Sequence, residues 1–478
     1  MIWIALSQII TTILSAATLP ALTKSFSTAS YGIWTQINVT TGLIVPVLTL
    51  QFGNAVVRFL AGENDKTTRR RSLGAMFCAI LIFSIILFIP IGIFAPQLSN
   101  FLFNNTSYVH FVYLTFLWTF IEGLTGFFIS YLRARGQMLT LSIIQVLFSV
   151  SHLVLIVVLA TLGFGLERII ISLIFVDSLF TIGTLCIIVR LEGFPTPNFT
   201  RMKTFLLFSI PQVPTGLLIW IIASSDRFFI THFLSLSETG IYSSSDLLGG
   251  IIILLYFPII FVLLPAVSKA WEQNRRDSVR IYFEYSIKLF LTLAIPAAVG
   301  LSILSQPILR IITSSDYLAG WQLVLLVSIG TIFSGLFQIN SYIIYLVEKT
   351  PWITLIALIA AIISVTLNYV LIPRIGIIGC AISTVVSYFT LSTIIFILTR
   401  QIVKYNINYI YWGKVVIATL IMALLLFFVK VHSILGIISA IVGGAIIFGL
   451  VIFLLGAFSK QDKRLIKETL VGLIPWVH

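Results

Sequence analysis

Charged side chains are scarce in this sequence, where Asp, Glu, Lys and Arg together make up 9% of the 478 residues. Soluble domains average about 25% of these residues, because they must cover a surface that faces water. Hydrophobic residues make up 59% of the chain. The shortage of charge excludes a water-soluble globular fold and indicates a polytopic membrane protein.

Cysteine is also scarce, and the short motifs of common enzymes are missing. The three cysteines, Cys78, Cys186 and Cys380, lie within apolar runs and form no CxxC pair, which excludes a disulfide framework and a cysteine-based zinc site. The sequence has no HExxH, DxD, GxSxG or phosphate-loop motif. We therefore expect a protein that is not an enzyme and that holds no metal or cofactor.

Long apolar runs are what the sequence has in abundance. A helix needs about 20 mainly apolar residues to cross the hydrocarbon core of a bilayer. The runs predict an all-α polytopic membrane protein with about 14 transmembrane helices. The expected spans are 2–23, 34–60, 72–95, 107–131, 138–162, 168–189, 203–230, 238–268, 281–305, 319–346, 351–373, 377–399, 409–430 and 434–457.

The basic residues gather in alternate loops. Lys and Arg accumulate in the cytoplasmic loops of membrane proteins, and most of the 29 basic residues fall on one side of the predicted spans. We therefore expect a multi-pass protein of the cytoplasmic membrane with both termini in the cytoplasm. The net charge of +13 then records membrane topology, and nucleic acid is not expected as a partner.

The segments that follow the first and the seventh spans resemble each other. Identical residues stand at four matching positions of segments 23–34 and 231–242, namely Thr23/Thr231, Ser27/Ser235, Gly32/Gly240 and Ile33/Ile241. An even number of spans separates the two copies, so both halves face the same way. We expect two six-helix lobes with pseudo-twofold symmetry about the membrane normal, plus two C-terminal helices.

The repeat also sets the expected domain boundaries. A loop rich in glycine and proline follows the sixth span and is the natural connector between the lobes. The expected parts are an N-terminal lobe at 1–190, a cytoplasmic linker at 191–202, a C-terminal lobe at 203–400, two additional transmembrane helices at 401–457 and a cytoplasmic tail at 458–478. Two such lobes would enclose a central cleft.

Four short motifs resemble a known family: Tyr31–Trp34, Gly53 with Arg58–Leu60, Asp226–Arg227, and Gly240–Ser243. With the span count and the repeat, they are similar to the Wzx-type oligosaccharide flippases, a polysaccharide transporter family of the multidrug/oligosaccharidyl-lipid/polysaccharide (MOP) exporter superfamily. The resemblance implies transport of a polyprenyl-(di)phosphate-linked oligosaccharide from the cytoplasmic to the outer leaflet by alternating access. Its expected partners are this glycan, the lipid bilayer and glycosyltransferases or a polymerase of the same pathway.

Other functions remain as alternatives. The lipid II flippase branch of the superfamily also has fourteen spans, and a cation-coupled exporter of drugs or small molecules would use the same fold. A polytopic glycosyltransferase or polymerase is less favoured, because the expected outer loops are too short to carry a catalytic domain. The spans contain both cations and carboxylates, so the sequence does not decide between a phosphate and an organic cation as the substrate.

A charge inside a membrane span is costly and is a functional candidate by default. Arg58, Arg227 and Lys288 are the candidate ligands of a lipid diphosphate, because Arg and Lys are the residues that bind phosphate. For Arg58 the alternative is a side chain that reaches back to the interface. For the other two it is an ion pair, with Asp226 or Glu238 in one case and with Glu284 in the other.

Three titratable residues fall at similar depth in neighbouring spans: Glu122, His152 and Asp177. Together with Asp246, they are the candidate site for coupling to H⁺ or Na⁺, since buried carboxylates bind protons or cations. The alternative is a set of structural hydrogen bonds between helices. Asp246 is expected either to line the cleft or to pair with Arg227.

Helix-breaking residues cluster in the seventh span. Pro211, Pro214 and Gly216 lie within two turns, and proline removes a backbone hydrogen bond and kinks a helix. We expect a hinge there. A pure packing role is the alternative, because glycine and proline are common in membrane helices.

Overall fold

The computed structural model of the chain describes residues 2–405, 409–429, 431 and 433–457. The predicted cytoplasmic tail at 458–478 and the basic residue Lys430 lie outside the described residues. Within those ranges the regular secondary structure is entirely helical, which confirms the predicted all-α fold.

The described chain folds into α-helices and short 3-10 helices, the latter labelled η. In order they are α1 (Ile2–Ser25), α2 (Thr28–Leu48), α3 (Phe52–Leu60), α4 (Lys66–Ile93), α5 (Ala95–Phe103), η1 (Thr106–Tyr108), α6 (Val109–Ala134), α7 (Met138–Thr161), α8 (Leu166–Glu192), η2 (Phe199–Arg201), α9 (Met202–Ser209), α10 (Gln212–Ser224), α11 (Asp226–Phe233), α12 (Leu236–Gly250), η3 (Ile251–Leu255), α13 (Tyr256–Glu272), α14 (Arg276–Ile312), η4 (Ser315–Gln322), α15 (Leu323–Leu346), α16 (Thr350–Ile375), α17 (Ile377–Ile402), α18 (Tyr409–Phe427) and α19 (Ile434–Leu454).

Among the described residues, 13 helices are long and apolar enough to cross a membrane, and the count reaches 14 when the bent pair α2 and α3 is taken as one span. This agrees with the predicted number of spans. The predicted span 34–60 is bent by 48°, because Leu50 and Gln51 adopt left-handed backbone with φ of 50° and 54°. L-residues do not continue a right-handed helix in that conformation.

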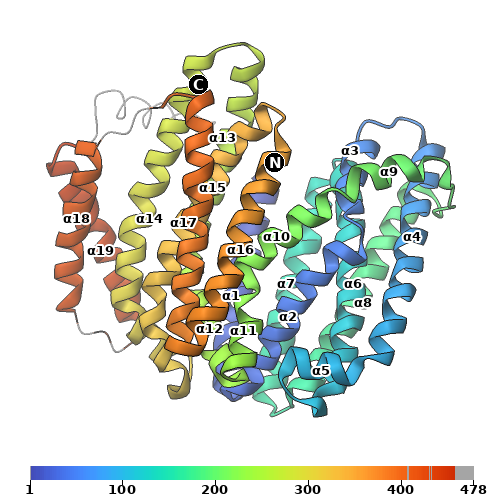
Figure 1. Cartoon of the computed structure of the whole chain (residues 1–478), viewed down its shortest axis with the longest axis horizontal. Helices are drawn as coiled ribbons and strands as arrows, with labels where there is room; N and C mark the ends of the chain where they lie inside the picture. Colours follow the sequence, from blue (N-terminus) through green and yellow to red (C-terminus); the bar gives the residue numbers. More distant parts are fainter. Residues whose placement is uncertain (1, 406–408, 430, 432, 458–478) are drawn as a thin grey trace.

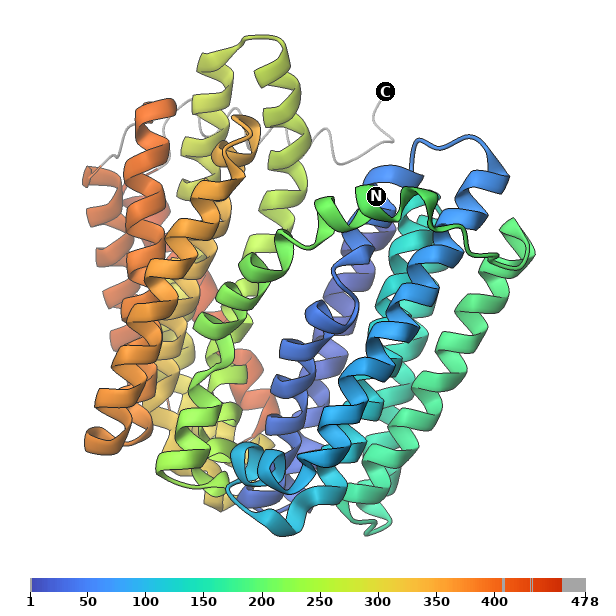
Figure 2. The same ribbon diagram turned by 45° about the vertical axis from the view of Figure 1, so that its right-hand side comes forward.

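The helices form two lobes. Figure 1 shows α2 to α8 on the right and α13 to α19 on the left. In Figure 2 the lobes approach each other at the lower end and spread apart toward the end that holds the N terminus. Each lobe has its own hydrophobic core, around Phe127 and Phe128 in one and around Phe283 and Phe290 in the other. This arrangement confirms the predicted two-lobed architecture, while the exact residue limits of the parts stay predictions.

The lobes meet where the internal repeat begins, at a contact between α2 and α12 that we call the lobe crossing. Its centre is formed by Gly32 and Gly240, one of the identical pairs of the repeat. A Cβ on Gly32 would lie 1.9 Å from the carbonyl oxygen of Leu236, and one on Gly240 would lie 2.2 Å from that of Thr28. Glycine is needed because backbone approaches backbone this closely.

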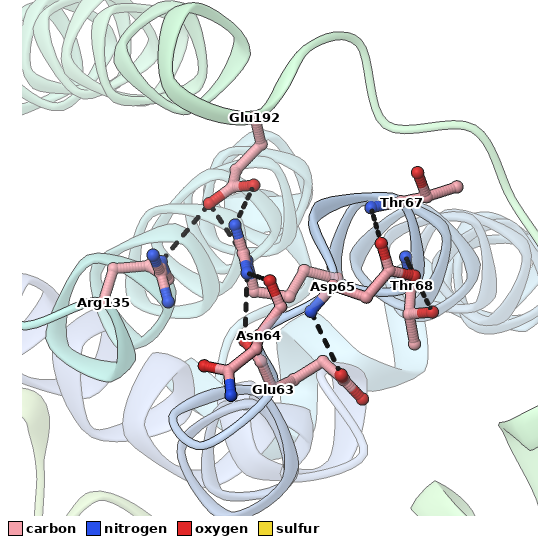
Figure 3. Close-up of polar contacts among 8 residues, drawn as sticks. Glu63, Asn64, Asp65, Thr67, Thr68, Arg135 and Glu192 are labelled. Carbon is pink, nitrogen blue, oxygen red and sulfur yellow. Dashed lines mark hydrogen bonds and ion pairs between the residues drawn. The ribbon is translucent and has the colours of Figure 1, made fainter.

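The opposite end of the N-terminal lobe is fastened by an ionic cluster that we call the brace, made of Glu63, Arg69, Arg135, Glu192 and Arg201. The Glu192 carboxylate accepts hydrogen bonds from Arg69 at 3.0 and 3.3 Å and lies 3.3 Å from Arg135 Nε (Figure 3). Arg201 donates to Glu63 at 3.1 Å. The brace ties the loop after α3, the first turn of α4, the ends of α6 and α8, and the segment that leads to α9.

Asp65 caps α4 at the same end of the molecule. Its carboxylate accepts hydrogen bonds from the Thr68 hydroxyl at 2.5 Å and from the backbone N–H groups of Thr67 and Thr68 at 3.1 and 2.9 Å (Figure 3). These hydrogen bonds hold the pKa of Asp65 below its ordinary value, and the one from the Thr68 hydroxyl has the largest effect on it. An ionised cap satisfies N–H groups that a helix start leaves without partners.

Candidate functional site

A cavity of about 500 Å³ lies between the lobes, and we call it the central cavity. Helices α1, α2, α6, α7 and α8 line it from the N-terminal lobe, while α11 and α12 line it from the other. Its walls hold Glu122, His152, Asp177, Arg227 and Asp246. Five of the seven charged or titratable candidates from the sequence therefore meet in one space.

The N-terminal wall of the central cavity carries the predicted coupling residues. Asp177 on α8 is 1% exposed. It accepts a hydrogen bond from the indole N–H of Trp118 on α6 at 2.8 Å, and His152 Nε2 on α7 lies 2.5 Å from its other oxygen. The centre of the Phe148 ring, one turn before, lies 4.3 Å from the centre of the His152 imidazole. Glu122 lines the same cavity one turn beyond Trp118.

The opposite wall of the central cavity is built around Arg227, which lies in the first turn of α11. Its guanidinium donates to the carboxylate of Asp226 at 2.6 Å and to the carboxylate of Asp246 on α12. The alternative of an ion pair with Asp226 is thus what the structure contains, and Asp246 both lines the cavity and pairs with Arg227. Two carboxylates therefore surround one guanidinium, and both pairings were among the alternatives that the sequence left open.

The two carboxylates that hold Arg227 differ in their surroundings. Asp226 is enclosed: its other oxygen accepts a hydrogen bond from the Tyr242 hydroxyl at 2.8 Å and lies 3.2 Å from Cys380 Sγ. The Asp246 side chain is 31% exposed, against 2% for Asp226. Asp226 is therefore the enclosed partner of Arg227, and Asp246 is the partner that is partly exposed in the cavity.

The structure does not bring the three predicted phosphate ligands together. Arg58 is exposed on α3 and does not line the central cavity. Lys288 lies on α14 in a second cavity of about 780 Å³, which we call the lateral cavity. There its ammonium stands 4.3 Å from the centre of the Tyr411 ring and 5.6 Å from that of Tyr285. Of these three predicted ligands, only Arg227 lines the central cavity between the lobes.

The predicted hinge coincides with a break in the helix. α9 ends at Ser209, and α10 begins at Gln212 directly after Pro211. Pro214 lies in the first turn of α10, and a Cβ on Gly216 would come within 3.2 Å of the Gln51 side chain, at the bend of the second span. The two irregular spans therefore lie side by side, and a hinge role for 211–216 stays a proposal.

Further cavity residues come from α2 and were not among the predicted site residues. Trp34 packs on Trp118 with ring centres 5.5 Å apart, and Asn38 lies one turn further along. Trp34 is the last residue of the Tyr31–Trp34 motif and Asn38 follows it at helical spacing, which is the signal that could have found them. No cluster of three or more His, Cys, Asp or Glu side chains suited to a metal ion occurs within the described residues.

The fold and the central cavity define a class of protein: multi-pass membrane proteins whose two helical lobes enclose a charged cavity. The model of the family described as "Polysaccharide biosynthesis protein" matches residues 1–271, and that of the MatE family matches residues 211–370. The first match covers more than half of the chain, so the chain belongs to the polysaccharide biosynthesis protein family. This confirms the predicted membership in the MOP superfamily.

Two curated relatives are archaeal. The chain is 23% identical over 287 residues to the probable low-salt glycan biosynthesis flippase Agl15 of Haloferax volcanii, covering 58% of this chain and 59% of that protein. It is 25% identical over 238 residues to the uncharacterized membrane protein MJ1068 of Methanocaldococcus jannaschii, covering 49% and 46%. The chain thus matches less than two thirds of the length of either relative.

Solved structures share the fold. The lipid II flippase MurJ in an inward closed conformation gives a TM-score of 0.79 at 16% identity, covering 96% of this chain and 98% of that one. An inward-facing multidrug resistance MATE transporter of the MOP superfamily gives 0.65 at 16% identity, covering 82% and 94%. An outward-facing MATE structure gives 0.57 at 13% identity, covering 84% and 94%.

Proposed function

We propose that the chain is a flippase that moves a polyprenyl-(di)phosphate-linked oligosaccharide from the cytoplasmic to the outer leaflet, for assembly of a cell-surface glycan. The observation that carries the proposal is the charged central cavity between two lobes, in a member of the polysaccharide biosynthesis protein family. The similarity to Agl15, described as a probable glycan biosynthesis flippase, and to MurJ, described as a lipid II flippase, supports it. Glycosyltransferases or a polymerase of the same pathway are the proposed partners.

The physical task fits such a cavity. A sugar head group and its phosphates cannot cross hydrocarbon without polar partners, whereas a polyprenyl tail can stay in the lipid. The central cavity offers the Trp34 and Trp118 rings for sugar faces, the Asn38 amide for hydroxyl groups and the Arg227 guanidinium for phosphate.

We propose that phosphate binds by exchange at Arg227. The guanidinium presents a fork of donors that suits a phosphate as well as a carboxylate. Asp246 is the exposed partner, so an entering phosphate takes its place while Asp226 stays bound. When Asp246 returns to Arg227, the phosphate is expelled. Arg58, exposed near the end of α3, is proposed as an earlier phosphate contact outside the cavity.

The pair of His152 and Asp177, with Glu122 nearby, is the proposed site for coupling to H⁺ or Na⁺. The 2.5 Å contact between His152 Nε2 and the Asp177 carboxylate joins two groups that can hold a proton between them in the cavity wall. A proton bound there alters the net charge of a space that also holds the phosphate of the substrate.

Alternating access would separate the lobes at the lobe crossing. The N terminus and the brace lie at the opposite end, which we propose as the cytoplasmic side, with both termini in the cytoplasm. The breaks at Leu50–Gln51 and at Pro211 are the proposed points of bending.

Flipping in vesicles tests the proposal. Purified protein in lipid vesicles is expected to move a fluorescent polyprenyl-diphosphate sugar between leaflets faster than protein-free vesicles do, as measured by quenching from the outside. Equal rates with and without protein would contradict the proposed function.

A second function deserves a test because the central cavity holds more carboxylates than cations. Glu122, Asp177 and Asp246 would suit an organic cation, so a cation-coupled exporter of small molecules is the alternative. The match to the MatE family over 211–370 supports it. Efflux of a fluorescent organic cation from the same vesicles, without movement of the lipid-linked sugar, would favour this function.

A further inference from the structure

Three consecutive serines stand on α12 about one turn after Gly240 of the lobe crossing, and their hydroxyl groups differ in what they contact. The hydroxyls of Ser244 and Ser245 donate to the backbone carbonyl of Ile241 at 2.8 and 3.2 Å, as serine often does inside a helix. The Ser243 hydroxyl is buried, and no hydrogen-bond partner for it occurs among the described residues. Of the three serines, Ser243 is the one that lines the central cavity.

A second donor without a partner belongs to the same wall of the central cavity. Arg227 is held through two of its side-chain nitrogens, which donate to the carbonyl of Ala223 and to the carboxylates of Asp226 and Asp246. Its third nitrogen, Nε, is buried and has no partner in the described part of the chain. Most buried polar groups are hydrogen-bonded, and one that is not calls for an explanation. Two such donors in one wall indicate a ligand that accepts from both.

The geometry of α12 places the two donors close together. Ser243 and Asp246 are three residues apart, so they share one face of the helix, with Cβ atoms about 5–6 Å apart. Helix side chains point toward the start of their helix, so the Asp246 carboxylate lies over the turn that carries Ser243. That carboxylate accepts from Arg227, whose guanidinium carbon is 5.1 Å from the centre of the Tyr242 ring. The guanidinium therefore lies beside this turn.

We propose that Ser243 Oγ and Arg227 Nε form a two-donor subsite for the phosphate of the transported lipid, which makes Ser243 a specificity-determining residue of the central cavity. The inference rests on the proposed flippase function. A phosphate group carries several oxygens in a small volume, so it accepts from a hydroxyl and an N–H together, and its contact with the guanidinium is charge-assisted. Asp246 is the partly exposed partner of Arg227. A movement of this one side chain opens both donors to the cavity.

The chemistry of the subsite favours an oxyanion over the organic cation of the alternative function. A guanidinium has five N–H donors and no acceptor, so an organic cation finds a like charge there and nothing that binds it. A sugar hydroxyl can accept from either donor, but it brings no negative charge to the guanidinium. A phosphate supplies both the charge and the acceptors. The carboxylates on the opposite wall, Glu122 and Asp177, contribute nothing to this subsite.

Binding of a fluorescent polyprenyl-diphosphate sugar to the full-length protein in detergent tests the proposal, with a fluorescent organic cation as the second probe. Ser243→Ala is expected to weaken binding of the lipid about tenfold, the size expected for one charge-assisted hydrogen bond, and to leave binding of the cation unchanged. Wild-type affinity for the lipid in Ser243→Ala would overturn the proposal. Equal weakening for both probes would also overturn it, because it would report a change in the shape of the cavity.

Two control variants accompany this test. Ser244→Ala removes a hydroxyl that already has a partner in its own helix, so the lipid should bind as it does to the wild type. Lys349→Gln removes an exposed base outside the central cavity, and it should also bind normally. Weakening by Ser244→Ala as large as that by Ser243→Ala would contradict the assignment to Ser243.

A pair of variants with the same shape separates the hydroxyl from the fit of the side chain. Ser243→Thr keeps the hydroxyl and Ser243→Val lacks it, and thermal unfolding shows whether both are folded. We expect the threonine variant to bind the lipid about tenfold more tightly than the valine variant. Equal affinities would overturn the proposal. Its failure would leave flipping by the wild-type protein in vesicles intact, whereas absence of that flipping would contradict the proposed function itself.

Discussion

Two ionic networks in this molecule are built from the same residue types but differ in how much of each network is exposed. The brace pairs Glu192 with Arg69 and Arg135, and the central network pairs Arg227 with Asp226 and Asp246. The Glu192 side chain is 4% exposed, whereas that of Asp246 is 31% exposed and lines a cavity. A buried pair that only protein groups reach is a structural tie. A pair with one partner open to a cavity can exchange that partner for a ligand.

The surroundings of the two guanidinium groups sharpen the difference. Arg69 donates from all three of its nitrogens, to Glu192 and to the backbone carbonyls of Glu63 and Asn64. Arg227 Nε is buried, and no hydrogen-bond partner for it occurs in the described part of the chain. The protein therefore satisfies all three nitrogens of Arg69, whereas it satisfies two of the three nitrogens of Arg227.

The largest effect is expected from breaking the brace. Glu192→Gln leaves Arg69 buried without a counter-charge, and removal of one partner of a buried ion pair costs about 3–5 kcal/mol. Thermal unfolding in detergent, followed by tryptophan fluorescence, measures the loss. The matched control is Glu63→Gln, because its partner Arg201 is 43% exposed and an exposed pair contributes about 1 kcal/mol or less. Equal unfolding temperatures for the two variants would refute the structural role of Glu192.

The central network is expected to respond in function more than in stability. Asp246→Asn removes the exchangeable partner, and Arg227 keeps Asp226 as its counter-ion. We expect nearly wild-type thermal unfolding. The phosphate of the lipid should bind about tenfold more tightly, because the Asp246 carboxylate no longer competes for Arg227 through a charge-assisted hydrogen bond. Flipping should be slower, because nothing displaces the phosphate. Binding titrations and the vesicle assay measure both. Weaker binding by Asp246→Asn would rule out exchange at Arg227.

The lobe crossing holds the two lobes together by backbone contact and without charged side chains at its centre. Gly32→Ala places a Cβ against the Leu236 carbonyl, so we expect the crossing to open and transport to slow several-fold. Gly62→Ala, near the brace, is the control because a Cβ there meets nothing within 4 Å. Labelling of Ser243→Cys by an impermeant maleimide from the outer side should be faster in Gly32→Ala. Unchanged labelling would argue against a closed outer gate at this contact.

The smallest effect is expected at the Asp65 cap beside the brace. Its pKa is lower in the folded chain, so its contribution to stability is present above the unfolded pKa of about 3.9 and is lost as the pH falls through the folded value. Asp65→Ala should therefore lower the unfolding temperature slightly at pH 7, with the difference shrinking in acid. A difference that grows below pH 4 would contradict the assignment of the cap.

Much of the fold could be predicted from the sequence because apolar runs and basic loops report directly on spans and sides. The sequence also indicates how deep a residue lies along its span, and for that reason it could predict that Glu122, His152 and Asp177 lie close together. The face of a helix could not be read from uniformly apolar sequence, and for that reason Lys288 was grouped with Arg227, although it faces the lateral cavity. The bend at Leu50–Gln51 lies between two helix-breaking residues, Pro46 and Gly53, but the residues with left-handed backbone are themselves neither glycine nor proline, so the exact place of the bend could not be predicted.

The flipping rate of a polyprenyl-diphosphate sugar by a charge-balanced variant of the central network tests the account most directly. Arg227→Gln combined with Asp226→Asn removes both charges of the enclosed pair, so the net charge of the network is unchanged and the partly exposed Asp246 is the charge that remains. The account expects this double variant, folded by thermal unfolding, to flip at the rate of protein-free vesicles, while the control Lys349→Gln flips at the wild-type rate. Wild-type flipping by the double variant would contradict the central claim that Arg227 receives the phosphate.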